Sequence, residues 1–155
     1  MRRNIKLAVF FSFSLFVSGV TTAQDSDVRV HTWKAESKKI VERKFELIFS
    51  TPVSADWQIY APNQVLLDVK TTELNFSDSA VRQEGDFVID PAQIKEEASS
   101  IFENTKVKLL PGDVLWKAII HIEGTVPAKL QGTLLYTYGR KDEFFPATFL
   151  PFSVS

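Results

Sequence analysis

The chain has 155 residues, of which 45% are hydrophobic and 24% are charged, and its formal net charge is −1. This composition is typical of a globular protein and argues against a disordered or fibrous one. A chain of this length is expected to form a single domain. It can bury enough surface to fold without disulfides or a bound metal.

The first 23 residues have the three parts of a secretory signal peptide. Three basic residues precede an apolar stretch from Leu7 to Val17, and small residues lead up to Ala23. This pattern predicts cleavage near Ala23 and export, which places the mature domain, residues 24–155, in the periplasm or outside the cell. The apolar stretch is shorter than the ~20 residues that cross a bilayer, and no later stretch approaches that length. We therefore expect no membrane span after cleavage.

Charge and cysteine content argue against two further classes of function. Loss of residues 1–23 removes three basic and no acidic residues, which takes the net charge from −1 to −4. A protein that binds the phosphate backbone of a nucleic acid needs a basic face, so nucleic acid is not an expected partner. The chain has no cysteine, so it can perform no thiol chemistry of its own.

Alternation of apolar and polar residues predicts short β-strands along most of the mature chain. About eight or nine short strands, with turns every eight to twelve residues, indicate an all-β protein and specifically an immunoglobulin-like antiparallel β-sandwich. The predicted strands cover residues 28–34, 44–50, 57–60, 65–69, 74–76, 106–110, 115–122, 130–138 and 144–154, with polar turns at 36–39, 111–113, 124–127 and 139–143.

Residues 77–104 interrupt this pattern, because they are polar and acidic and contain Gly85 and Pro91. We expect the chain to leave the sheet here, in one short helix or an irregular loop. An aspartate followed by a proline is typical of a helix start, so Asp90 is the expected N-cap. The segment that follows predicts one or two helical turns over residues 92–102.

The sequence shows no pattern that points to catalysis or to a bound metal. Its two histidines, His31 and His121, are ninety residues apart, and neither belongs to a motif with ligand spacing. The chain contains no G-x-S-x-G or S-x-x-K motif and no glycine-rich phosphate loop. We therefore expect a protein that is not an enzyme and that carries no cofactor.

Aromatic residues are the remaining candidates for a binding surface. Most of them are expected to pack inside the domain or across neighbouring strands. Consecutive strand residues point to opposite faces of a sheet, so Phe144 and Phe145 cannot both enter the same core. One of these two side chains is expected to be exposed or covered by a loop.

The order of several short motifs resembles one known family. These motifs are W-x-I-Y at 57–60, an aromatic loop at 100–103, G-x-L-x-Y at 132–136, and a closing strand with F-P and F-x-V at 145–154. The family is the N-terminal domain of the DsbD-type thiol:disulfide interchange proteins, also described as a disulfide bond corrector (DsbC-like) domain. The resemblance implies a periplasmic immunoglobulin-like sandwich that passes electrons from a membrane-embedded partner to soluble oxidoreductases.

In that family two active cysteines near the last hairpin follow a pattern resembling Y-x-x-C-x4-C-x-P. Placed on this sequence from Tyr136, the pattern puts Gly139 at the first cysteine and Phe144 at the second. Thiol exchange proceeds by thiolate attack through a mixed disulfide, so these residues cannot perform it. The aromatic loop that shields the cysteines in the family corresponds to Ile101 and Phe102.

These observations lead to the hypothesis of a non-catalytic, exported sandwich that acts by protein–protein contact through its last hairpin. Exposed aromatic residues and arginine beside a turn are the residue types that anchor protein interfaces. The resemblance points to a periplasmic thioredoxin-like protein or a membrane redox protein as the partner, including those of cytochrome maturation. The expected binding residues are Phe102, Tyr136, Tyr138, Arg140, Phe144 and Phe145.

An alternative hypothesis is a sandwich that binds a glycan or another small molecule, with Trp57, Trp116 and the tyrosines as stacking platforms. Glycan binding predicts a change in tryptophan fluorescence when a sugar is added. Protein docking predicts that Phe144→Ala weakens capture of a partner and leaves the fold intact. If Phe144 belonged to the core, the same change would lower the free energy of unfolding by ~3–5 kcal/mol.

Overall fold

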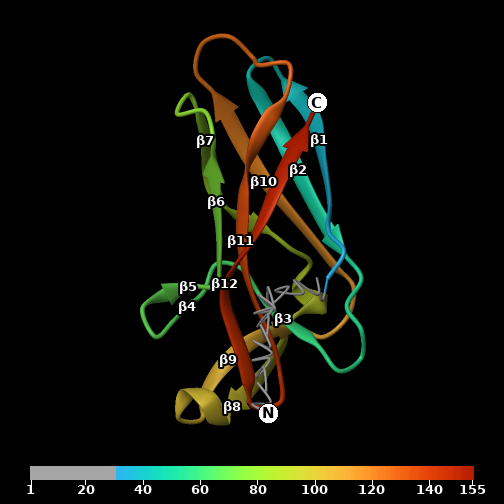
Figure 1. Ribbon diagram of the computed structural model, residues 1–155, viewed down its shortest axis with the longest axis vertical. Helices are drawn as coiled ribbons and strands as arrows, with labels where there is room; N and C mark the ends of the chain where they lie inside the picture. Colours follow the sequence, from blue (N-terminus) through green and yellow to red (C-terminus); the bar gives the residue numbers. More distant parts are fainter. Residues whose placement is uncertain (1–30) are drawn as a thin grey trace, which may run out of the picture.

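The computed structural model describes residues 31–155, so the signal peptide predicted over residues 1–23 lies outside the described part. The described residues form two antiparallel sheets, which pack as a sandwich, and a small separate hairpin (Figure 1). The predicted all-β sandwich is confirmed. Among residues 31–155 no helix is long and apolar enough to cross a membrane.

The first sheet, sheet A, has four strands in the order β1, β2, β10, β7. In β10, the buried residues Trp116, Ala118 and Ile120 alternate with more exposed neighbours. This is the period-two pattern of a strand with one face toward the core. The strands are β1 (Lys34–Val41), β2 (Lys44–Thr51), β7 (Val81–Val88) and β10 (Val114–Ile122).

The second sheet, sheet B, follows the order β12, β11, β3, β9, β8. Strand β11 pairs with β12 on one side, and on its other side with β6 and then with β3. Strands β8 and β9 lie at the lower end of the molecule in Figure 1. The strands are β3 (Gln58–Tyr60), β6 (Thr72–Phe76), β8 (Lys95–Ser99), β9 (Thr105–Leu110), β11 (Leu130–Arg140) and β12 (Glu143–Val154), and the separate hairpin is β4 (Val65–Leu66) with β5 (Val69–Lys70).

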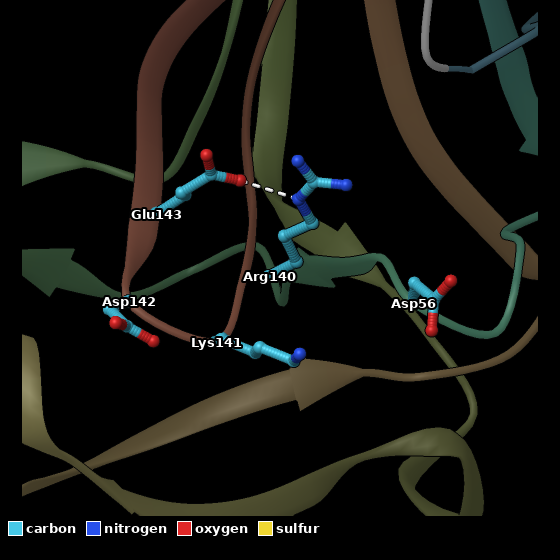
Figure 2. A pocket seen from close by; sticks show the side chains of 5 residues that line it. All are labelled: Asp56, Arg140, Lys141, Asp142 and Glu143. Atoms are coloured by element: carbon cyan, nitrogen blue, oxygen red, sulfur yellow. Dashed lines mark hydrogen bonds and ion pairs between the residues drawn. The ribbon is translucent and has the colours of Figure 1, made fainter.

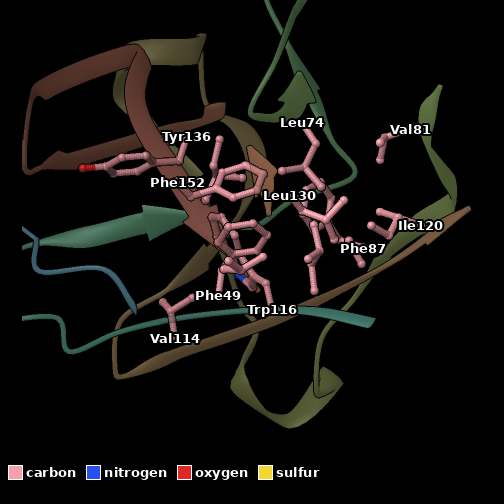
Figure 3. Close-up of a cluster of buried hydrophobic side chains, with 14 of the residues drawn as sticks. Phe49, Leu74, Val81, Phe87, Val114, Trp116, Ile120, Leu130, Tyr136 and Phe152 are labelled. Carbon is pink, nitrogen blue, oxygen red and sulfur yellow. The ribbon is translucent and has the colours of Figure 1, made fainter. Parts of the chain in front are cut away.

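The main core lies between the two sheets. Phe49 of sheet A meets Phe152 of sheet B edge-on, with ring centroids 5.2 Å apart, and Trp116 is fully buried beside them (Figure 3). Burial of aromatic side chains of this size dominates the energy of a core. The aromatic content of the sequence is therefore used largely for packing, as expected.

A second cluster, here called the outer cluster, lies on the opposite face of sheet B. Strand alternation requires it, because Ile59 and Leu110 enter the main core while their neighbours Tyr60 and Leu109 point the other way. The buried members of the outer cluster are Tyr60, Leu66, Phe102, Val107 and Leu109, and the partly buried residues Ile101 and Phe144 pack against them.

The first strand differs from its prediction. Strand β1 begins at Lys34, and residues 36–39, predicted as a turn, lie within it. Among the described strands β1 pairs only with β2, and most of its residues are exposed. A solvated edge strand has little apolar alternation, which explains why its pattern was not apparent. The turn that follows contains Arg43 with a φ of 61°.

The segment 77–104, predicted to leave the sheet, contains the two strands β7 and β8. Both lie at the edge of a sheet and are rich in charged residues, which hides their alternation. The predicted strand over 65–69 is also wrong, because the chain turns at Leu67 and Asp68 to form the β4–β5 hairpin.

The predicted helix is replaced by two single 3₁₀ turns. Asp90 does cap the first of them, because its carboxylate accepts a hydrogen bond from the Ala92 N–H at 2.9 Å. That turn ends at Gln93, and the chain then enters β8, so the helix predicted over 92–102 is wrong. The two turns are η1 (Pro91–Gln93) and η2 (Ser100–Phe102).

Gly132 in β11 allows a close approach of its neighbours. A Cβ added there would lie 2.5 Å from the Asn75 carbonyl oxygen and 2.9 Å from the Phe152 ring. We expect Gly132→Ala to lower the free energy of unfolding by about 1–3 kcal/mol, because paired backbone and a buried ring have little room to move. Urea denaturation measures this change.

Gly112→Ala is the matched control, because a Cβ added at Gly112 meets nothing within 4 Å. We expect its effect on the free energy of unfolding to be below about 0.5 kcal/mol. Equal stability of the two variants would contradict the prediction.

Candidate functional site

The β11–β12 hairpin brings together the two positions at which the sequence resembles the family's cysteines. Gly139 pairs directly with Phe144, and Tyr138 pairs with Phe145. Directly opposed residues of antiparallel strands have Cα atoms ~4.5–5.5 Å apart, which is within the range of a disulfide. The spacing of the two positions is therefore the one that the resemblance requires.

Gly139 nevertheless has no room for a side chain. A Cβ added at this position would overlap the carbonyl oxygen of Glu143 and would lie 3.5 Å from the ring of Tyr60. A cysteine at position 139 would require the backbone of the hairpin to open. The local packing, as well as the residue type, thus departs from a disulfide site.

A β-bulge determines the face on which each aromatic residue of this hairpin lies. The register between the two strands shifts between Tyr136 and Tyr138, where β12 contains one residue more than β11. Ala147 in this bulge has a φ of 51°. An extra residue shifts the alternation of a strand by one position. Phe145 therefore lies on the core side of sheet B, and Phe144 lies on the opposite side.

Phe144 packs against the outer cluster. Its ring meets Phe102 edge-on at 4.9 Å and Tyr60 edge-on at 5.2 Å. Phe102 is carried by η2 and is buried. Burial, with a smaller contribution from the charge of Glu97, raises the pKa of Tyr60, so its hydroxyl stays protonated at neutral pH. The outer cluster is therefore a packed group of aromatic and aliphatic side chains.

An open cluster of side chains lies on the core side of the same hairpin. Tyr138 stacks on Phe145, with 4.9 Å between the centroids and 13° between the planes, and Trp57 packs against Tyr138 at 5.4 Å. The Arg140 guanidinium lies over the Trp57 ring, 4.5 Å from its centroid. Phe145 is 38% exposed, and Arg140 is exposed as well. These four residues, Trp57, Tyr138, Arg140 and Phe145, are called the hairpin patch below.

A charged cleft of about 470 Å³ adjoins the hairpin patch (Figure 2). The Nε of Arg140 donates a hydrogen bond to the Glu143 carboxylate, which raises the pKa of Arg140, with a smaller contribution from Asp56. The arginine therefore stays charged, and its guanidinium lies over the Trp57 ring. The lining residues are Asp56, Arg140, Lys141, Asp142 and Glu143.

The acidic residues of this cleft do not form a metal centre. Within the described part of the chain, no group of three or more histidine, cysteine, aspartate or glutamate side chains is arranged to hold a metal ion. The charges of the cleft are mixed, and one carboxylate is already paired with Arg140. The chemistry that the site offers is therefore aromatic stacking and ion pairing.

The structure separates the six predicted binding residues. Phe102 and Tyr136 are 4% and 5% exposed, so neither side chain is available for direct contact with a partner. Phe144 is partly buried against the outer cluster. The three others belong to the hairpin patch: Tyr138, Arg140 and Phe145.

The structure also places the two tryptophans of the glycan hypothesis in different surroundings. Trp57 belongs to the hairpin patch, although the sequence pattern suggested it only as a stacking platform for a glycan. Its place depends on the pairing of Gln58 with Gly139, a long-range contact for which the sequence contains no local signal. Trp116 is completely buried, so it cannot serve as a stacking platform.

Phe144 is expected to contribute to stability, contrary to the expectation that its removal leaves the fold intact. We expect Phe144→Ala to lower the free energy of unfolding by about 2 kcal/mol, because it removes two ring contacts and opens a cavity beside Tyr60. Chemical denaturation with urea measures this effect.

Phe149→Ala is the matched control, because Phe149 lies in the same strand and is 70% exposed. Its expected effect is below about 0.5 kcal/mol. A Phe144→Ala variant as stable as this control would show that the outer cluster does not depend on Phe144.

Comparisons with known proteins agree with the fold. No family model matches the sequence, and no curated protein matches it. The crystal structure of the N-terminal periplasmic domain of ScsB from Proteus mirabilis is similar, with a TM-score of 0.53 and 10% sequence identity. The similarity covers 78% of this chain and 43% of that chain, so this protein spans less than half the length of the ScsB structure. The chain thus shares the fold of this periplasmic domain.

Proposed function

We propose that the mature chain is an exported, non-catalytic docking module that binds a periplasmic thioredoxin-like protein through the hairpin patch. The observation that carries this proposal is the open cluster of three aromatic rings and one arginine on the last hairpin. In the DsbD-type domains that the sequence resembles, two cysteines near the same hairpin carry the exchange with partner proteins. The similarity to the ScsB domain supports the fold on which that hairpin is built.

The hairpin patch has the physical properties of an interface anchor. Tryptophan, tyrosine and arginine dominate the residues whose loss most weakens protein complexes. Here the Arg140 side chain is held in advance by its ion pair with Glu143 and by its contact with Trp57. A side chain that is already ordered loses less conformational entropy when a partner binds.

The opposite face of the hairpin supports a role without thiol exchange. The positions that resemble the family's cysteines hold Gly139 and Phe144, and the first of them is closed by the Glu143 carbonyl. A partner could still contact the hairpin, since the hairpin patch lies on the other face. Recognition without electron transfer is therefore the function that we assign to it.

Glycan binding is a weaker candidate. Trp57 is partly exposed at the edge of the charged cleft, which suits a sugar-stacking platform. However, the Arg140 guanidinium already covers one face of that ring. A sugar-dependent change in tryptophan fluorescence that is lost in Trp57→Phe would favour this alternative over protein docking.

Site-specific photo-cross-linking tests the docking proposal. With p-benzoyl-phenylalanine in place of Phe145, we expect a covalent adduct with a thioredoxin-like protein in cells that export the chain. Combining this label with Arg140→Ala is expected to lower the adduct yield by about tenfold, the effect of losing ~1.4 kcal/mol of binding free energy. Mass spectrometry identifies the cross-linked protein.

The same label in place of Phe149 is the control, because that side chain is 70% exposed but lies outside the hairpin patch. Equal yields from positions 145 and 149 would refute docking through the patch. Adducts that contain no thioredoxin-like protein would refute the proposed class of partner.

A further inference from the structure

The residues just before β1 lie against the aromatic face of β11. We call residues 31–33 the strap. His31 is 3% exposed and meets Tyr138 edge-on at 5.0 Å and Tyr136 edge-on at 5.8 Å. Trp33 is partly buried and packs on Tyr136 at 5.1 Å. The rings of His31 and Trp33, which are two residues apart, therefore both lie against the core face of sheet B.

The strap is attached differently from the strands that follow it. It belongs to no strand, because β1 begins at Lys34. Trp33 also contacts Trp116 of the main core, at 5.0 Å. Ring contacts therefore hold the strap, and it can leave without breaking the ladder between β1 and β2. Segments with few strand hydrogen bonds open at a lower free energy than the sheet itself.

His31 is buried without polar compensation. Neither of its ring nitrogens has a hydrogen-bond partner within residues 31–155. The titratable side chains that meet it from β11 are Tyr136 and Tyr138, whose rings it contacts edge-on. No charged side chain of the described residues shifts its pKa, which is lowered from 6.5 by burial alone. A protonated imidazole at this place would be a buried cation without a counter-charge.

We propose that the strap is an acid-released cover, which leaves the aromatic face of β11 when His31 takes up a proton while the sandwich stays folded. The released strap binds a proton more readily than the docked strap, because its imidazole is hydrated. The free energy of docking is therefore fully present above pH 6.5, the ordinary pKa of histidine, and decreases as the pH falls below it.

Release of the strap would enlarge the hairpin patch. Tyr138 lies between His31 and Phe145, at 5.0 Å from the first ring and 4.9 Å from the second. Removal of His31 uncovers the part of the Tyr138 ring that His31 contacts, beside the exposed ring of Phe145. This consequence rests on the proposed function, whereas release of the strap does not.

Fluorine NMR of the protein labelled with 5-fluorotryptophan tests the release directly. The chain has three tryptophans, and they report on different regions: Trp33 on the strap, Trp57 on the hairpin patch and Trp116 on the core. Between about pH 7.5 and about pH 4.5, we expect the Trp33 signal to move to the position of a solvent-exposed ring. The Trp116 signal should shift when the neighbouring Trp33 ring leaves, but it should stay away from the position of the unfolded protein, which would show that the sandwich remains folded.

Two histidine variants make the test specific. In His31→Phe, which keeps an aromatic ring but cannot be protonated, the Trp33 signal should not change with pH. In His121→Gln the Trp33 signal should change with pH as in the wild type. His121 lies on β10, is partly exposed and does not belong to the strap. His31→Leu serves the same purpose if the phenylalanine variant does not fold.

Three results would overturn the proposal. They are an unchanged Trp33 signal in the wild type, a change that persists in His31→Phe, and a Trp116 signal that reaches the position of the unfolded protein together with the change in Trp33. Cross-linking from position 145 tests the consequence separately, since its yield should be higher at pH 5 than at pH 7. A pH-independent yield would refute the regulatory role while leaving release of the strap and docking intact.

Discussion

The bulge in β12 is the constraint on which the two faces of the last hairpin depend. Strict alternation along this strand would place Phe145 on the same face as Phe149, and Phe144 on the same face as Phe152. The extra residue beside Ala147 reverses this assignment. Phe145 therefore stacks on Tyr138 in the open patch, and Phe144 turns toward the outer cluster. A single backbone irregularity thus separates the open hairpin patch from the packed outer cluster.

The position of β12 explains why this irregularity is tolerated. It is the first strand in the order of sheet B, and it carries Pro146 in the bulge and Pro151 opposite Thr133. Proline has no N–H to donate, so it is found in edge strands and bulges. Both features also make the outer edge of β12 a poor template for an added strand. A partner at this end of the sandwich is therefore better recognised by side chains than by strand addition.

Strands whose apolar residues alternate could be predicted, and β2, β10 and β11 follow their predicted ranges closely. Strands β1, β7 and β8 could not, because these edge strands are largely solvated, rich in charged residues and poor in regularly spaced apolar residues. The proximity of positions 139 and 144 agrees with the resemblance, although residues 139, 140 and 143 belong to the strands and not to the predicted turn. The place of Trp57 and the burial of His31 depend on contacts with distant strands, which no local pattern reveals.

The packing around Gly139 leaves no space for a cysteine side chain, in addition to the lack of a thiol at this position. A reactive cysteine pair needs space for two sulfur atoms and access for the thiol of a partner. At this hairpin the carbonyl of Glu143 takes the space of one side chain, and Phe144 occupies the other position beneath Phe102. Restoring two sulfur atoms alone would therefore not restore the geometry of exchange. The closed face serves stability, and we assign recognition to the open face, where Arg140 and the aromatic rings remain accessible.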